Sequence, residues 1–367
     1  ADFSSIEPIV DEVFAAVRSN GDAAVREYSK KFDAYTPDQF FVDTLAFENA
    51  KSELSSELVD AIDVAYENIY LFHKAQKTAP VRLDTKEGIS CWQEKKPIEK
   101  VGVYIPGGTA PLFSTVLMLA IPAQLAGCSQ IVLCTPPNKA GVSAAIRYAA
   151  QKCGVKLLAQ IGGIQAIAAL TFGTESIPKV YKIFGPGNQF VTVAKQMATK
   201  YQTAIDMPAG PSELLVVADS IAKPAYVAAD LLSQAEHGKD SQVILVTTTK
   251  EMGELVKAEL DKQLLALPRK EIAAAALENS LAVYFDNEQF ALDFINQYGP
   301  EHYIACVENE HLFIDGIINA GSVFIGNYTP ESAGDYASGT NHTLPTNGYT
   351  KQYSGVNLDA FLKAITY

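Results

Sequence analysis

Residues 101–134 read VGVYIPGGTAPLFSTVLMLAIPAQLAGCSQIVLC, and this stretch decides the fold. It begins with an apolar run of strand length, Val101–Ile105, passes through a glycine turn, and continues as a helical stretch, Leu112–Leu125. A second apolar run, Ile131–Cys134, follows. A helix between two such runs is the usual crossover of a parallel sheet. The stretch therefore predicts an α/β protein.

The same alternation continues on both sides of this unit. It forms two series of similar size, 101–206 and 213–326, which predict two parallel sheets, each covered by helices on both faces. We expect strands at Val101–Ile105, Ile131–Cys134, Lys156–Gln160, Val180–Phe184, Leu214–Ala218, Val243–Val246, Ala282–Phe285, Tyr303–Val307 and Val323–Ile325. We expect helices at Leu112–Leu125, Val142–Gln151, Gln189–Lys200, Ala225–Glu236 and Met252–Leu265. Ligands of such sheets bind at the carboxyl ends of the strands.

The chain before residue 79 is predicted to be helical. Apolar residues recur at helical spacing in Ile6–Asn20, Ala23–Phe32 and Ser55–Lys74. Phe40–Val42 is a possible short strand, and Ile89–Lys96, which holds the only tryptophan, alternates like a strand. The last residues, after Leu358, resemble the start of another helix.

The composition excludes several classes of protein. A net charge of −13 over 367 residues argues against nucleic acid as a partner, because phosphate binding needs clustered Lys and Arg. The longest apolar run, Val116–Cys128, is too short to span a membrane, and we expect a cytoplasmic protein. The cysteines lack metal-site spacing and are interpreted as buried reduced thiols: Cys91, Cys128, Cys134, Cys153 and Cys306.

Three glycine turns follow predicted strands, at residues 106–108, 162–163 and 185–188. Each precedes a helix, so backbone N–H groups could meet a pyrophosphate. None completes a Gly-x-Gly-x-x-Gly fingerprint, since Phe190 stands at the third glycine of the last turn. Tight strand-to-helix turns also need glycine for geometric reasons alone, so both interpretations stay open.

Residues 298–346 hold the residues most suited to chemistry. Glu301 and His302 place an acid beside a base at the start of a strand, and a long loop after the next strand carries Asp335 and His342. Gln234 and His237, three residues apart at a helix end, share one face. With Asp335 and His342 they could hold zinc, although Gln-x-x-His at a helix end is also an ordinary cap. His73 and His311 are interpreted as structural, His73 as a charged or half-exposed residue near a helix end.

At this point the chain resembles the histidinol dehydrogenase family. The resemblance covers nearly the whole chain and rests on long motifs: VGVYIPGGTAPLFSTVLMLAIPAQLAGC at Val101, KIFGPGNQFVTVAK at Lys182, AIDMPAGPSELLVVAD at Ala204, DLLSQAEHGKDSQVILVT at Asp230, YGPEHYI at Tyr298 and NAGSVFIGNYTPESAGDYASGTNHTLPT at Asn319. It implies zinc-dependent oxidation of L-histidinol to L-histidine through histidinal with two NAD, by a homodimer.

The resemblance also assigns roles to residues. It implies Glu301 and His302 as the catalytic pair, and Gln234, His237 and Asp335 as zinc ligands. It implies NAD contacts from Tyr104, Gln165 and Asn188. The implied substrate-binding residues are Ser212, Gln234, His237, His302, Asp335 and His342.

The implied architecture is a pair of incomplete Rossmann-like domains with an N-terminal helical segment. An NAD-binding domain of residues 103–209 is inserted in a larger one of residues 1–102 and 210–350, and residues 351–367 begin a tail. In the family this tail crosses to the partner subunit and supplies a further zinc-ligand histidine and a substrate-binding glutamate, whereas here no histidine follows His342. One alternative is therefore a metal-binding or regulatory protein without turnover. An aldehyde dehydrogenase with a cysteine nucleophile is disfavoured, because no cysteine sits in a predicted strand-end loop.

Overall fold

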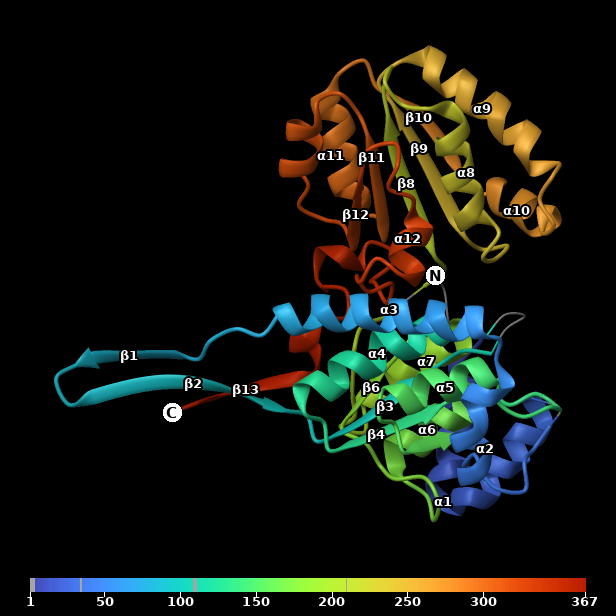
Figure 1. The fold of residues 1–367 in the computed structure, drawn as a ribbon, viewed down its shortest axis with the longest axis vertical. Helices are drawn as coiled ribbons and strands as arrows, with labels where there is room; N and C mark the ends of the chain where they lie inside the picture. The colour runs from blue at the N-terminus through green and yellow to red at the C-terminus, as the bar shows by residue number, and fades with distance from the viewer. Residues whose placement is uncertain (1–3, 34, 108–110, 209) are drawn as a thin grey trace. The chain divides into compact units, whose positions relative to one another are not determined.

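The computed structural model describes residues 4–33, 35–107, 111–208 and 210–367. The chain divides into two compact units, each built around its own sheet (Figure 1). The first unit comprises Ala1–Pro208, Tyr336–Thr343 and Val356–Tyr367. The second comprises Ala209–Asp335 and Leu344–Gly355.

The first unit contains a five-stranded parallel sheet in the order β5-β4-β3-β6-β7. Numbered along the chain, this order is 3-2-1-4-5, which is the dinucleotide-binding order without its sixth strand. The strands are β3 (Lys100–Tyr104), β4 (Gln130–Cys134), β5 (Leu157–Ala159), β6 (Lys182–Phe184) and β7 (Ala204–Ile205).

Helices cover both faces of this sheet because successive strand residues point to opposite faces. Val103 belongs to the apolar core shared with α3 (Ser56–Ala75), α4 (Phe113–Ala126) and α5 (Ala144–Lys152). Tyr104 belongs to the core shared with α1 (Glu7–Phe32), α6 (Gly163–Phe172) and α7 (Gln189–Thr199). The short elements α2 (Thr44–Glu48) and η1 (Asn49–Glu53) connect α1 to α3. A kink at Gly21, with φ 52°, separates the two predicted halves of α1.

A three-stranded antiparallel sheet extends from the first unit as an arm (Figure 1). It contains β1 (Val81–Lys86), β2 (Ile89–Pro97) and β13 (Leu362–Thr366). The ring of Trp92 stacks on that of Tyr367, with centroids 5.0 Å apart. The prediction of a helix after Leu358 is wrong. A single 3-10 turn, η4 (Leu358–Phe361), places Phe361 against Phe184, and the backbone then pairs with β2.

The second unit repeats the same strand order, as β10-β9-β8-β11-β12, again all parallel. The strands are β8 (Glu213–Ala218), β9 (Gln242–Thr247), β10 (Leu281–Tyr284), β11 (His302–Cys306) and β12 (Ser322–Ile325). One face packs against α8 (Pro224–Ala235), α9 (Lys250–Leu264) and α10 (Lys270–Leu277). The other packs against α11 (Glu288–Tyr298) and the π-helical turn η2 (His311–Asp315).

The α/β class, both parallel sheets and all nine predicted strands are confirmed. The observed units differ from the expected domains, because residues 4–102 group with the sheet of 103–208 rather than with 210–350. The reason is apolar packing of α1 on α6 and of α3 on α4. The loop predicted before Thr346 contains a helix, α12 (Glu331–Tyr336), and a 3-10 turn, η3 (Tyr349–Lys351), follows the loop. Within the described residues, no helix is long and apolar enough to cross a membrane.

Candidate active site

The second unit gathers acidic residues around one histidine at the amino ends of its strands. Glu213 is the first residue of β8, and His302 is the first residue of β11. The two strands pair in parallel with His302 opposite Leu214, so these residues share one edge of the sheet. The candidate residues of this unit therefore lie at the amino ends of its strands, as expected for Glu301 and His302, and not at the carboxyl ends where such sheets usually bind ligands. Because α8 runs antiparallel to the strands, its last turn, with Gln234, reaches the same edge.

His302 has a fixed tautomer in its neutral form. Its side chain is buried, with 4% of the residue exposed. Nδ1 lies 3.1 Å from the backbone oxygen of Glu213, and a carbonyl only accepts, so Nδ1 carries the proton. Nε2 is buried and makes no hydrogen bond within the part of the chain that the structure describes. In neutral His302 the lone pair on Nε2 is thus available to take a proton.

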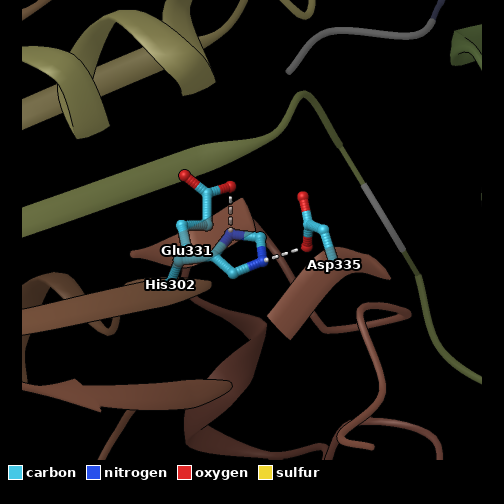
Figure 2. Close-up of side chains that lie close together, drawn as sticks. All are labelled: His302, Glu331 and Asp335. Atoms are coloured by element: carbon cyan, nitrogen blue, oxygen red, sulfur yellow. Dashed lines mark ion pairs between the residues drawn. The ribbon is translucent and has the colours of Figure 1, made fainter. Parts of the chain in front are cut away.

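Two carboxylates of α12 lie on either side of the His302 ring (Figure 2). Glu331 Oε1 is 3.6 Å from Nδ1, and Asp335 Oδ1 is 3.6 Å from Nε2. They are four residues apart on one helix, so they share a face. The carboxyl group of Asp230, on α8, faces the backbone N–H of Glu331 at the start of this helix, and this N–H acts to lower the pKa of Asp230. Sequence reasoning missed Glu331, whose signal was the i, i+4 spacing to Asp335 behind a proline.

Glu301 is also buried and is tied to the neighbouring strand. Its Oε2 accepts a hydrogen bond of 2.8 Å from the backbone N–H of Glu213 and lies 3.7 Å from His302 Nδ1. Glu213 in turn accepts a hydrogen bond from the backbone N–H of Asn347 through its own carboxylate. The predicted acid–base pair is therefore held by backbone groups on both sides.

Burial governs the protonation of this cluster. It raises the pKa of Glu301 and of Glu331 to about 8, that of Glu213 to about 7 and that of Asp230 to about 6. Burial lowers the pKa of His302, but the carboxylates around it outweigh this effect and raise it to about 10. Several buried carboxyl groups face a single imidazole, so when they ionise the site carries more negative than positive charge. A bound cation would offset that excess and lower these pKa values, which favours the ionised carboxylates and the neutral imidazole that base catalysis needs.

The predicted metal ligands lie in this same unit. Gln234 is completely buried, and neither its amide nitrogen nor its oxygen has a hydrogen-bond partner among the described residues. His237 lies two residues beyond the end of α8. Burial lowers its pKa, and the charges of Asp335 and His302 act on it as well. His302, Glu331 and Asp335 offer ligand atoms that all lie within 4.8 Å of one another, which makes a metal site here geometrically feasible.

Two of the three predicted cofactor contacts lie together in the first unit, at the carboxyl end of its sheet. Tyr104 ends β3, and its hydroxyl accepts a hydrogen bond of 3.1 Å from the backbone N–H of Gly163, at the start of α6. Gln165 lies two residues further along, in the first turn of α6, and is completely buried. Asn188 caps α7 by accepting from the backbone N–H of Val191, which gives it a structural role. Gly108 of the first glycine turn lies outside the described residues.

The remaining candidates are placed as follows. Ser212 is half-buried before β8, and its backbone oxygen accepts from Gln242. His342 belongs to the first unit, where Nε2 lies 2.9 Å from Thr115 Oγ1. The interpretation of His73 as half-exposed is wrong, because it is fully buried. His311 is exposed and pairs with Asp315. Burial of cysteines is confirmed for Cys134, Cys153 and Cys306, whereas Cys91 and Cys128 are half-buried.

Comparison with known proteins gives a consistent result. A family model described as histidinol dehydrogenase matches residues 1–367. The histidinol dehydrogenase of Bacteroides thetaiotaomicron is 55% identical over 366 residues, which cover 100% of this chain and 85% of that protein. The histidinol dehydrogenase of Escherichia coli K12 is 52% identical over 364 residues, covering 99% and 83%.

Solved structures agree. The histidinol dehydrogenase of Elizabethkingia anophelis superposes with a TM-score of 0.96 at 53% identity, covering 100% of this chain and 84% of that one. An acetylating aldehyde dehydrogenase from Geobacillus thermoglucosidasius gives a TM-score of 0.56 at 15% identity, covering 100% and 92%. This second likeness concerns the fold alone.

Proposed function

The chain belongs to the histidinol dehydrogenase family, and we propose that it oxidises L-histidinol to L-histidine through histidinal, as a zinc- and NAD-dependent enzyme of histidine biosynthesis. Oxidising a primary alcohol to a carboxylate removes two hydrides and adds the oxygen of one water. The reaction needs a base for the alcohol, a base for the water, and a site that fixes the substrate.

The observation that carries the proposal is the state of His302. Its Nδ1–H is held by the Glu213 carbonyl, and Nε2 is left without a hydrogen bond in the described structure. In the neutral form, Nε2 takes the hydroxyl proton of the substrate as hydride leaves the adjacent carbon. NAD, when bound, accepts that hydride.

Glu301 supplies the second base. Histidinal must be hydrated before its second oxidation, because the aldehyde has no hydroxyl on the carbon that loses hydride, whereas its hydrate does. The Glu301 carboxylate is buried beside His302 and is oriented by the Glu213 backbone N–H. We assign it to deprotonate the attacking water.

Gln234, His237 and Asp335 are proposed to hold zinc. The fit rests on Gln234, whose amide is buried without a partner among the described groups, since such a group costs about 1–3 kcal/mol unless a ligand satisfies it. The donor set of amide oxygen, imidazole and carboxylate suits zinc. Zinc, when bound, acts as a Lewis acid that anchors the imidazole and amino groups of the substrate. Glu331 adds negative charge at the same place.

The other site residues follow from the family. Tyr104, Gln165 and Asn188 are proposed to contact NAD. Ser212 and His342, together with the zinc-binding residues and His302, are proposed to contact L-histidinol. We further propose a homodimer, which sedimentation equilibrium tests directly.

The test is stoichiometric. Purified zinc-loaded protein, given L-histidinol and excess NAD, should form two NADH for each histidine released. One NADH with accumulation of histidinal, or equal activity on simple primary alcohols, would contradict the assignment.

A further inference from the structure

The starting point is the way in which the Gln165 side chain is held. Gln165 lies in the first turn of α6 and has no exposed surface. Its Nε2 donates a hydrogen bond of 2.9 Å to Asp33 Oδ2, at the carboxyl end of α1, and lies 3.5 Å from Ser29 Oγ. A carboxylate only accepts hydrogen bonds. Asp33 therefore selects the amide orientation with nitrogen toward α1.

This orientation turns the amide oxygen the other way. Oε1 of Gln165 is buried and has no hydrogen-bond partner in the part of the chain described. It lies against the glycine turn, since a Cβ added to Gly163 would be 2.9 Å from it. Gly163, with φ +63°, also donates its N–H to the Tyr104 hydroxyl. A buried acceptor without a donor thus lies beside the turn that begins α6, at the carboxyl ends of the strands.

A ligand with a hydroxyl or amide N–H group fits this arrangement. Leaving a buried acceptor unsatisfied is unfavourable, so a donor that reaches Oε1 gains more than it would in water. The ribose hydroxyls, the carboxamide and the adenine amino group of NAD are all such donors. The carboxyl end of a dinucleotide-type sheet is where a nucleotide is expected.

We propose that Asp33 is a positioning residue of the cofactor site, whose carboxylate holds the Gln165 amide so that Oε1 accepts a hydrogen bond from NAD. The inference rests on the proposed use of NAD. Asp33 does not touch the cofactor in this arrangement and acts only through Gln165. Any effect of Asp33 on cofactor binding must therefore disappear when Gln165 no longer carries an amide.

The experiment is a double-mutant cycle on the full protein, with NADH fluorescence as the readout of binding. Asp33→Asn lets the Gln165 amide turn either way and should raise the Kd for NADH roughly 5- to 30-fold, the scale of one lost hydrogen bond. Gln165→Met removes the acceptor at similar size and should weaken binding at least as much. In the Gln165→Met background, Asp33→Asn should then change the Kd less than twofold.

Two controls separate positioning from folding. Ser29→Ala removes the weaker neighbour of the same amide and should leave the Kd within twofold. Asp33→Glu keeps an acceptor-only group and should recover part of the affinity. In the steady state, Asp33→Asn should raise KM for NAD while kcat and KM for L-histidinol stay within twofold.

Several outcomes overturn the inference. An unchanged Kd in Asp33→Asn, or independent effects of the two substitutions, would show that Asp33 does not act through Gln165. A parallel loss of NADH and L-histidinol affinity, with a lower Tm, would mean a structural role only. If Asp33→Asn does not fold, Asp33→Glu with Gln165→Met completes the cycle. Because NADH binding is measured directly, a protein that binds NADH but leaves L-histidinol unoxidised would refute the reaction and not this assignment.

Discussion

Lys195 and Asp206 form an ion pair of 2.5 Å inside the first unit, with only 4% and 1% of their side chains exposed. Lys195 Nζ also donates to the backbone oxygen of Gly185, and Asp206 accepts from the Gly185 backbone N–H, each at 2.7 Å. One buried pair thus holds both polar groups of Gly185. With φ +123°, and with Tyr104 O only 2.1 Å from the place of a Cβ, this position admits glycine alone.

Replacing only one member of this ion pair should destabilise the first unit. Lys195→Met leaves the Asp206 carboxylate buried without its cation and should destabilise the first unit by about 3–5 kcal/mol. Thermal and urea unfolding followed by circular dichroism measure the loss. Lys257→Met, at the exposed Lys257–Asp261 pair, is the control and should cost less than about 1 kcal/mol. Equal small losses in both variants would show that the buried pair is not structural.

His73 should make stability depend on pH. Its Nδ1 donates to the Ile69 carbonyl at 2.8 Å, so Nε2 is left to accept from Asn341 Nδ2 at 3.3 Å, and burial lowers the pKa of this imidazole below 6.5. The unfolded chain binds the proton more tightly. Stability from this group is therefore complete above about pH 6.5 and falls as the pH drops below it, by at most about 1.4 kcal/mol per pH unit.

The variant His73→Gln should flatten that dependence between roughly pH 5 and 6.5, the region just below the ordinary histidine pKa. Unfolding free energies at several pH values give the slope. His311→Gln, at an exposed histidine, is the comparison variant. An unchanged slope in His73→Gln would show that His73 does not titrate on unfolding.

The two members of the proposed catalytic pair, His302 and Glu301, should be separable by half-reaction. His302→Asn removes the base for both oxidations and should slow each by roughly 10²- to 10⁴-fold. Glu301→Gln should mainly slow the oxidation of histidinal, because only that half consumes water. Single-turnover rates from L-histidinol and from histidinal measure the two halves, and equal losses in Glu301→Gln would refute the division of roles.

Substitution of a proposed zinc ligand should weaken zinc binding while leaving the fold intact. Asp335→Asn removes a charged ligand and should weaken zinc binding by at least about 10- to 100-fold, measured by competition with a chelating dye. Asp315→Asn, at an exposed acid of the same unit, should bind zinc like the wild type. Wild-type affinity in Asp335→Asn would remove Asp335 from the ligand set.

The sheets could be predicted from the sequence because each strand is a short apolar run between turn signals. Val101–Ile105 and Leu214–Ala218 are buried on both faces, so their composition alone marks them. The two-residue strand β7 was missed because it is too short to leave a pattern. The end of the chain was misassigned because β13 is set by pairing with β2, more than 260 residues earlier.

Only part of the candidate site could be predicted from the sequence, again because some of it depends on residues far apart in the chain. Glu301 and His302 stand out as neighbours, and Gln234 and His237 by their spacing. Their surroundings depend on contacts between distant segments, such as Glu213 with the backbone N–H of Asn347. No local pattern shows that Glu213 supplies both the carbonyl that fixes His302 and the N–H that orients Glu301.

The stacking of Trp92 on Tyr367 has a practical consequence for spectroscopy. Trp92 is the only tryptophan, and it lies on the arm rather than in either parallel sheet. Intrinsic indole emission therefore reports the docking of β13 on β2. A melting curve recorded from tryptophan emission follows the arm and does not report the unfolding of the two five-stranded parallel sheets. Far-ultraviolet circular dichroism, which measures the peptide bonds, follows the loss of those sheets.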